Sequence, residues 1–291
     1  MKATLDCIPC CLRQAVDTAR LISSRPEDQE KIIRAVLQWL AGLEMAGLDL
    51  PVPPKLTQHL HRLIREVGGM ADPYQAMKEY ENEVALQLLP ELRAQISTAA
   101  DPLLMALRLA IAGNVIDAGV FGHIDAAQVQ QAVRQALTEP FVGDVEDFRR
   151  AVSEAHHILY LADNAGEIVL DRLLIEQLSL SSPTQPTRVT VAVRGRPIIN
   201  DATIADAVAA GIDQVAEVID NGSDAPGTLL ADCSATFRAV FEAADLVIAK
   251  GQGNFESLSD EPGNILFLLK AKCPVVANYL GVAPGTQVLT R

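Results

Sequence analysis

The sequence has few aromatic residues and little positive charge. Phe, Trp and Tyr make up 4% of its 291 residues, so the core must be built mainly from Leu, Val, Ile and Ala. Its 24 Lys and Arg against 37 Asp and Glu give a net charge of −13, whereas general nucleic-acid-binding proteins usually present a basic surface. We therefore expect no nucleic-acid partner. A small anionic ligand remains compatible with this charge, because a bound cation and local basic groups can reverse the field inside a cleft.

Long apolar runs and a regular disulfide framework are also missing. No uncharged segment is long enough to cross a bilayer, and the stretch from Met1 to Asp6 lacks the apolar core of a signal peptide. The five cysteines are an odd number, and Cys7, Cys10 and Cys11 lie together, unlike the paired cysteines of small secreted domains. We expect a cytoplasmic protein without a membrane partner. The sequence leaves the oligomeric state open.

The hydrophobic pattern divides the chain into two parts. With 49% hydrophobic residues the chain can bury a full core. Residues 1–150 show mainly helical periodicity, which predicts an N-terminal helical subdomain. Residues 151–291 alternate β-rich runs with helical patterns, as expected for an α/β domain. Strands are predicted at 157–162, 188–193, 214–219, 245–249 and 273–279, and helices at 168–180, 203–210, 229–243 and 264–270.

This alternation predicts the fold class. Strands joined by helices form right-handed crossovers and a largely parallel sheet that is covered on both faces. We expect a three-layer α/β/α fold with a mainly parallel, Rossmann-like sheet, preceded by the helical subdomain. In such a sheet the carboxyl ends of neighbouring parallel strands lie at one edge, where ligands bind. We expect the site to lie at that edge of the domain formed by residues 151–291.

Polar side chains follow the predicted strands at this edge. Asp163 and Asn164 come directly after the first strand, and Asp201 lies in the polar segment after the second. Two carboxylates and one amide oxygen are ligands of the kind that Mg²⁺ or Mn²⁺ prefers. A second interpretation is that these side chains cap the helices that follow them, as Asp and Asn often do. The sequence alone leaves both interpretations open.

Two further motifs carry weaker signals. The segment 250–254, Lys-Gly-Gln-Gly-Asn, has glycines that permit close backbone approach and a Lys that supplies positive charge, as in phosphate-binding loops. It lacks the P-loop pattern, and a flexible turn is an alternative.

The pair Cys7 and Cys10, with Cys11 beside it, has no second ligand pair for structural zinc. We interpret these cysteines as small apolar residues at a helix start, with an auxiliary metal or redox role as the alternative.

Taken together, these segments resemble the DUF89, or ARMT1-like damage-control phosphatase, family, and in particular its prokaryotic branch with an N-terminal Cys-x-x-Cys. The matching segments span nearly the whole chain in the family's order. They are residues 7–10, 113–117, 163–167, 194–203 and 250–256. No one of these segments is specific alone, but their combination is.

The resemblance implies an enzyme and a set of site residues. The enzyme would be a phosphatase that uses Mn²⁺, Mg²⁺, Co²⁺ or Ni²⁺ to hydrolyse phosphomonoesters of small metabolites, either sugar phosphates or phosphopantetheine-like compounds, in metabolite damage control. Asp163, Asn164 and Asp201 would bind the metal, and Lys250 would stabilise charge on the transferred phosphoryl group. The residues implied to contact or enclose the substrate are Asn114, Glu167, Arg194, Gly251 and Asn254.

Two other functions stay open at this point. One is a non-catalytic sensor that binds a metal or a metabolite, or changes oxidation state, through Cys7 and Cys10. The other is an S-adenosylmethionine-dependent protein carboxyl methyltransferase, an activity attributed to one branch of the family. The sequence has no Gly-rich nucleotide loop that would support the methyltransferase independently. A sensor would bind ligand without turnover, and a methyltransferase would bind S-adenosylmethionine.

Overall fold

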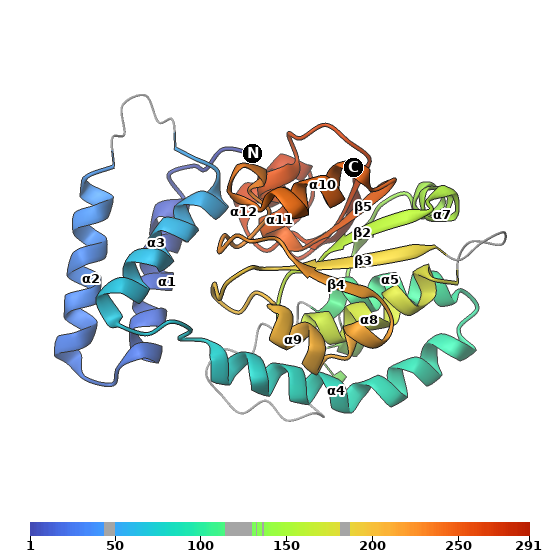
Figure 1. Ribbon diagram of the computed structural model, residues 1–291, viewed down its shortest axis with the longest axis horizontal. Helices are drawn as coiled ribbons and strands as arrows, with labels where there is room; N and C mark the ends of the chain where they lie inside the picture. Colours follow the sequence, from blue (N-terminus) through green and yellow to red (C-terminus); the bar gives the residue numbers. More distant parts are fainter. Residues whose placement is uncertain (44–49, 114–129, 132, 136, 181–186) are drawn as a thin grey trace.

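The computed structural model describes residues 1–43, 50–113, 130–131, 133–135, 137–180 and 187–291. Its centre is a seven-stranded sheet with the strand order β1-β7-β6-β5-β2-β3-β4, and all neighbouring strands are parallel except β6 and β7. The mainly parallel α/β fold is therefore confirmed (Figure 1). The strands are β1 (Phe141–Val142), β2 (His157–Leu161), β3 (Arg188–Val193), β4 (Glu217–Asp220), β5 (Leu246–Lys250), β6 (Ile265–Lys270) and β7 (Gln287–Thr290).

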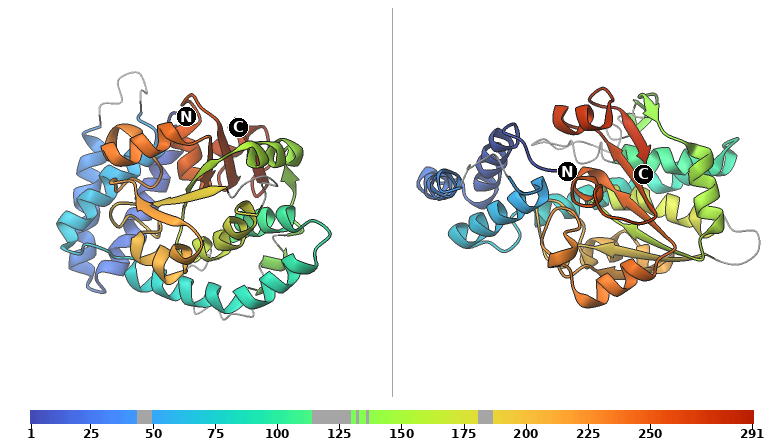
Figure 2. Two further views of the ribbon diagram at one scale, coloured as in Figure 1. Left: turned by 45° about the vertical axis from the view of Figure 1, so that its right-hand side comes forward. Right: turned by 90° about the horizontal axis from the view of Figure 1, so that it is seen from above.

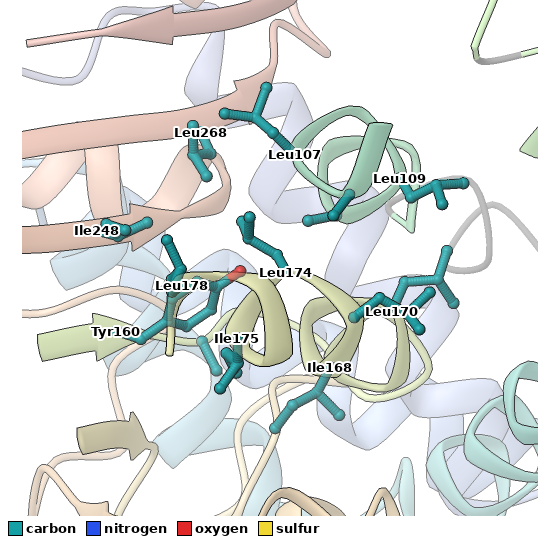
Figure 3. Close-up of a cluster of buried hydrophobic side chains, with 14 of the residues drawn as sticks. Leu107, Leu109, Tyr160, Ile168, Leu170, Leu174, Ile175, Leu178, Ile248 and Leu268 are labelled. Carbon is teal, nitrogen blue, oxygen red and sulfur yellow. The ribbon is translucent and has the colours of Figure 1, made fainter. Parts of the chain in front are cut away.

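Helices cover both faces of the sheet. Side chains of successive strand residues point to opposite faces, so Tyr160 of β2 joins one hydrophobic cluster and Leu161 joins the other. The first face packs against α4 (Gln75–Thr98), α5 (Pro102–Ala112), α7 (Val145–Glu154), α8 (Glu167–Leu178) and α9 (Ile204–Ala209). The second face packs against α10 (Ala235–Ala243), α11 (Gly251–Leu258) and α12 (Pro274–Leu280). Figure 3 shows side chains of α5 and α8 meeting those of β2, β5 and β6 in the first cluster.

Three N-terminal helices form a separate unit beside the sheet (Figures 1 and 2). These are α1 (Cys7–Ile22), α2 (Pro26–Ala41) and α3 (Pro53–Gly68), and they share a hydrophobic cluster of their own. Helices α4 and α5 precede residue 150 but contribute to the core beneath the sheet. The domain boundary at residue 150 stays a prediction. Within the described ranges, no helix has both the length and the apolar character that a membrane span requires.

Two predicted elements are wrong and have exchanged types. The segment 264–270, predicted as a helix, contains strand β6, and the segment 273–279, predicted as a strand, contains most of helix α12. Residues 265–269 are a continuous apolar run, which does not distinguish a buried strand from a buried helix by periodicity. Val275 and Val276 suggested a strand, but Pro274 occupies the first turn of α12, where proline is well tolerated. The short strands β1 and β7 were not predicted.

Polar contacts join α3 to the loop after β4. The Asp224 carboxylate, whose side chain is 3% exposed, accepts hydrogen bonds from Gln58 Nε2 at 2.8 Å, Arg62 Nε at 3.0 Å and Arg65 Nη2 at 2.5 Å. Burial acts to raise the pKa of Asp224, but hydrogen bonds from Arg62 and Gln58 outweigh it and lower the pKa below its usual value. Asp224 therefore fastens the helical subdomain to the α/β domain.

We expect Asp224→Ala to lower the free energy of unfolding by about 2–3 kcal/mol, which is below the ~3–5 kcal/mol of a fully buried pair because Arg62 is partly exposed. A group with a lowered folded pKa stabilises the protein above its unfolded pKa, and this contribution is lost as pH falls through the folded pKa. Urea unfolding at pH 7 and at pH values below the ordinary aspartate pKa of 3.8 checks this: the difference in unfolding free energy between variant and wild type should narrow in acid. The exposed Asp213→Ala serves as the control, and an equal loss in both variants would contradict the role of Asp224.

Candidate active site

The candidate site lies at the carboxyl ends of β2, β3 and β5. From β2 the chain continues to β3 and β4 on one side, whereas β5 and β6 lie on the other, so the ends of β2 and β5 flank the topological switch point of the sheet. A cleft of about 260 Å³ opens there between the α/β domain and the helical subdomain. It is lined by Gln14, Pro54, Thr57, Asp163, Asn164, Ile199, Asn200, Asp201, Pro226, Gln252, Gly253, Glu256 and Lys272.

The structure brings Asp163, Asn164 and Asp201 together in this cleft. Asn164 and Asp201 face each other in an isolated antiparallel bridge, and the Ala202 backbone N–H donates to the Asp163 carbonyl at 2.8 Å. These backbone contacts join the turn after β2 to the loop after β3. All three residues are more than nine-tenths buried and line the same cleft. The two segments are thus held in a fixed position relative to one another.

None of these three side chains serves as a helix cap. Helix α8 begins after Gly166 without a side-chain cap, and α9 is capped by Thr203, whose capping box is completed by Asp206. The alternative interpretation of Asp163, Asn164 and Asp201 as capping residues is therefore wrong. Burying carboxylates away from water is costly unless they are paired, and both carboxylates have Arg194 as an ion-pair partner.

Electrostatics at this position favour a cation. Burial, reinforced by the nearby charges of Asp201 and Glu167, raises the pKa of Asp163 well above its usual range. Asn164 Nδ2 donates to Asp163 Oδ2 at 3.1 Å and to Glu167 Oε2 at 3.3 Å. Two carboxylates and an amide oxygen fit a hard divalent cation. In the described ranges no three His, Cys, Asp or Glu side chains group as a metal site.

Arg194 supplies positive charge behind the carboxylates. Its Nε donates to Asp201 Oδ2 at 2.6 Å, and its Nη2 lies 3.7 Å from Asp163 Oδ1. Nη1 lies 3.3 Å from Asn254 Oδ1, whereas Nη2 is buried without a hydrogen-bond partner among the described residues. An unsatisfied buried guanidinium N–H is costly, and it is the kind of donor that a phosphate oxygen satisfies. Arg194 therefore places an unsatisfied donor beside Asp163, but it is 2% exposed and, like Lys250, is not among the residues that line the cleft.

Lys250 takes a different position from the one the sequence suggested. Its ammonium group is fully buried and does not line the cleft; it donates to Ala110 O at 2.9 Å, Glu167 Oε1 at 2.6 Å and Asp171 Oδ1 at 2.5 Å. Burial disfavours the charged form, but the carboxylates of Asp171 and Glu167 outweigh it and raise the pKa of Lys250, so it stays protonated. In this arrangement Lys250 holds Glu167, and Glu167 in turn orients Asn164.

Gly251 and Asn254 are buried beside the cleft and are not among the residues that line it. Gly251 has a positive φ of 78°, and a Cβ atom there would lie 1.9 Å from Asp163 Oδ2, so only glycine lets α11 approach this carboxylate. Asn254 is fully buried and donates to Lys250 O at 2.8 Å and to Ala162 O at 3.3 Å. It therefore ties α11 to the end of β2. The predicted substrate residue Asn114 lies outside the described residues.

Sequence reasoning missed the contribution of α4. The buried side chain of Asn82 accepts from the Gly166 N–H at 2.7 Å and donates to Asp206 Oδ1 at 3.0 Å, and Glu81 accepts from Asn200 Nδ2 at 3.5 Å. These contacts support both loops that carry the candidate metal ligands. The residue before Asn200, Ile199, is the one described non-glycine residue with positive φ, at 43°, and such backbone strain often occurs at functional sites.

The cysteine pair lies at the edge of this region. Gln14, which lines the cleft, donates from Nε2 to Cys10 Sγ at 3.6 Å, and Cys11 is buried in the cluster of the helical subdomain. Burial raises the pKa of Cys10 and that of Cys11, the latter to about 12. Raised thiol pKa values oppose thiolate formation, and thiolates are the reactive and metal-binding form. The surroundings of Cys10 and Cys11 therefore favour the neutral thiol.

The fold and the cleft together define an open α/β protein with a carboxylate-rich cleft at the topological switch point of its sheet. Such sites bind small ligands against the strand ends and adjacent helix starts. The chain belongs to the family defined by the damage-control phosphatase ARMT1-like domain, whose sequence profile matches residues 3–288.

Individual relatives cover the whole chain. A damage-control phosphatase of Archaeoglobus fulgidus is 35% identical over 99% of this chain and 98% of its own length. A damage-control phosphatase of Pyrococcus horikoshii is 32% identical over 100% of this chain and 98% of its own length. The crystal structure of a DUF89 family protein from Pyrococcus horikoshii superposes with a TM-score of 0.87 at 31% identity, covering 100% of this chain and 99% of that one. These matches support phosphatase activity toward metabolites.

Proposed function

We propose that this protein is a divalent-metal-dependent phosphatase that hydrolyses phosphomonoesters of small metabolites. The observation that carries the proposal is the meeting of Asp163, Asn164 and Asp201 in one cleft, where none of them acts as a helix cap. The unsatisfied Nη2 of Arg194 beside Asp163 supports an anionic ligand at the same place. The names of the relatives as damage-control phosphatases agree with this chemistry.

Different residues of the chain have different roles in the proposed reaction. Asp163, Asn164 and Asp201 would hold Mn²⁺, Mg²⁺, Co²⁺ or Ni²⁺, which when bound polarises a phosphate oxygen and neutralises negative charge. Arg194 would donate from Nη2 to a phosphate oxygen and stabilise the charge that develops during phosphoryl transfer. Lys250 keeps Glu167 in place, and Glu167 fixes the amide of Asn164. Positioning and charge stabilisation account for most of the catalysis expected of such a site.

The shape and lining of the cleft support a small hydroxylated substrate. Its volume is about 260 Å³, and its described lining contains no aromatic ring that would stack on a base. Polar side chains in the lining would donate hydrogen bonds to substrate hydroxyl groups and accept hydrogen bonds from them. These side chains belong to Gln14, Thr57, Asn200 and Gln252. These features favour a sugar phosphate over the longer phosphopantetheine arm.

A metal-supplemented substrate screen tests the proposal. Chelator-treated protein would be assayed for phosphate release from hexose phosphates, pentose phosphates and phosphopantetheine, with Mn²⁺, Mg²⁺, Co²⁺ or Ni²⁺ added singly. We expect turnover only with metal, and faster turnover of the sugar phosphates. Binding of a phosphorylated ligand without any turnover would support the sensor alternative instead, and calorimetric binding of S-adenosylmethionine would support the methyltransferase.

A further inference from the structure

Glu256 is a buried carboxyl group in the cleft that the proposed reaction has not used. It lies on α11, is 8% exposed, and lines the same cleft as Asp163 and Asp201. Its Oε1 accepts a hydrogen bond from Gln252 Nε2 at 2.8 Å, and Gln252 Nε2 also lies 3.5 Å from Cys273 Sγ. The donor of this hydrogen bond is a neutral amide group. A carboxyl group in this setting is expected to hold a proton more readily than one in water.

The charged groups around Glu256 come from several elements. The Met1 amino group donates to the backbone carbonyl of Glu256 at 3.2 Å, and Cys10 of α1 is close enough to interact electrostatically with its carboxyl group. Lys272, between β6 and α12, lines the same cleft, as do Asp163 and Asp201.

The combined effect of burial and of these neighbours favours the protonated form of Glu256. Burial raises the pKa of Glu256 to about 7, against smaller lowering effects from the Gln252 hydrogen bond and the Met1 amino group. A carboxylic acid with a pKa near the working pH both holds a proton and releases it readily, which is the requirement for a general acid.

We propose that Glu256 is the general acid that protonates the leaving oxygen of the metabolite, a role that rests on the proposed phosphatase function. Asp163 and Asp201 contact Arg194 and are assigned to the cation in the proposed function, whereas Glu256 lines the same cleft and accepts a hydrogen bond from the neutral amide of Gln252. Alkoxides of sugars and other alcohols are strongly basic leaving groups. Their departure therefore gains most from a proton delivered at the leaving oxygen.

The proposed step is balanced in atoms and electrons. The bond between phosphorus and the metabolite oxygen breaks, and its electron pair stays on that oxygen, which takes the Glu256 proton and leaves as an alcohol. A water molecule supplies the new oxygen on phosphorus. One of its protons stays on the product as hydrogen phosphate, and the other restores the Glu256 carboxylate to the acid.

The test compares two leaving groups in the full-length protein with added metal. Glu256→Gln keeps the size of the side chain but removes the proton. We expect it to lower kcat about 10²–10⁴-fold on a hexose phosphate, the range for loss of a general acid. Its kcat on p-nitrophenyl phosphate should change by only a few-fold, because nitrophenolate leaves without protonation. The surface variant Glu261→Gln should match wild type on both substrates.

The pH profile provides the second readout. For the hexose phosphate, wild-type kcat should fall as pH rises through about 7, and this decline should be absent in Glu256→Gln and for p-nitrophenyl phosphate. A similar loss on both substrates in a variant with unchanged thermal unfolding overturns the general-acid role while leaving the phosphatase function in place. A wild type inactive on every phosphomonoester overturns both. If Glu256→Gln does not fold, the wild-type pH profiles on the two substrates test the proposal. The same decline of kcat with pH on the hexose phosphate and on p-nitrophenyl phosphate would contradict it.

Discussion

Replacing Asp201 by Asn is expected to lower metal-dependent phosphate release by about 10³-fold, the upper end of what loss of one charge-stabilising group costs. Asn can still accept the hydrogen bond from Arg194 Nε, which lies 2.6 Å from Asp201 Oδ2, so the variant removes a charge and keeps the contact. Asp163→Asn should act in the same direction, because both carboxylates belong to the same proposed cation site. The effects of the two substitutions on phosphate release should be non-additive, so that the double variant is little slower than either single variant.

The measurement is phosphate release at saturating substrate, together with calorimetric titration of Mn²⁺ into each variant. We expect weaker Mn²⁺ binding in both variants and unchanged binding in the exposed control Asp213→Asn. Thermal unfolding in the absence of metal separates a local effect from loss of the fold. Wild-type turnover in either Asp163→Asn or Asp201→Asn would show that the proposed ligand set is wrong.

Lys250→Met should destabilise the fold more than Asp224→Ala does. It would leave Glu167 and Asp171, which are both buried, without their cation, and breaking a buried ion pair costs about 3–5 kcal/mol. Asp171 Oδ2 already lacks a hydrogen-bond partner among the described residues, and burial, the largest effect, raises the pKa of Asp171 to about 7 even with Lys250 present. Urea unfolding should therefore show a loss near the upper part of that range at pH 8.

The pH dependence of this loss has a definite sign. The folded pKa of Lys250 is raised, so its contribution is fully present below its unfolded pKa, and wild type keeps it across pH 5–8. In Lys250→Met the Asp171 carboxyl group, whose folded pKa burial already raises, would destabilise the fold above its unfolded pKa and do so less as pH falls. The deficit relative to wild type should thus be smaller at pH 5 than at pH 8.

A matched set of variants identifies the cause of the stability loss in Lys250→Met. Adding Asp171→Asn to Lys250→Met removes one unpaired charge and should recover part of the lost stability, which a double-mutant cycle measures. The exposed Lys31→Met on α2 controls for the loss of a lysine in general. An equal deficit in Lys31→Met and Lys250→Met, or no recovery in the double variant, would contradict the role given to the buried ion pairs.

The sequence predicts the central strands well and the last ones poorly, for a physical reason. The runs that form β2, β3 and β5 are short, apolar and followed by polar turns, so their length and boundaries identify them. The run that forms β6 has the same apolar composition but lies just before Pro274. The valines after that proline have a high strand propensity, although they belong to helix α12. Which segment pairs with β5 is decided by tertiary packing, which local propensity does not contain.

The site could be located from the sequence because it depends on topology. Parallel strands place their carboxyl ends together, so Asp163 and Asp201 were predicted to meet, and the structure places both in one cleft. The direction of the Lys250 side chain could not be predicted, because a lysine at a strand end can turn toward the cleft or beneath α8. Asn82 was missed because a polar side chain on an amphipathic helix ordinarily faces solvent, and its partner Gly166 lies 84 residues away.

The most direct test of the central claim titrates Mn²⁺ into chelator-treated protein while bound metal and phosphate release from a sugar phosphate are recorded in the same samples. We predict that activity rises from near zero in proportion to metal bound at one site, and that Asp163→Asn and Asp201→Asn lose binding and activity together. Full turnover by the metal-free protein, or metal binding that both variants retain, would contradict the account.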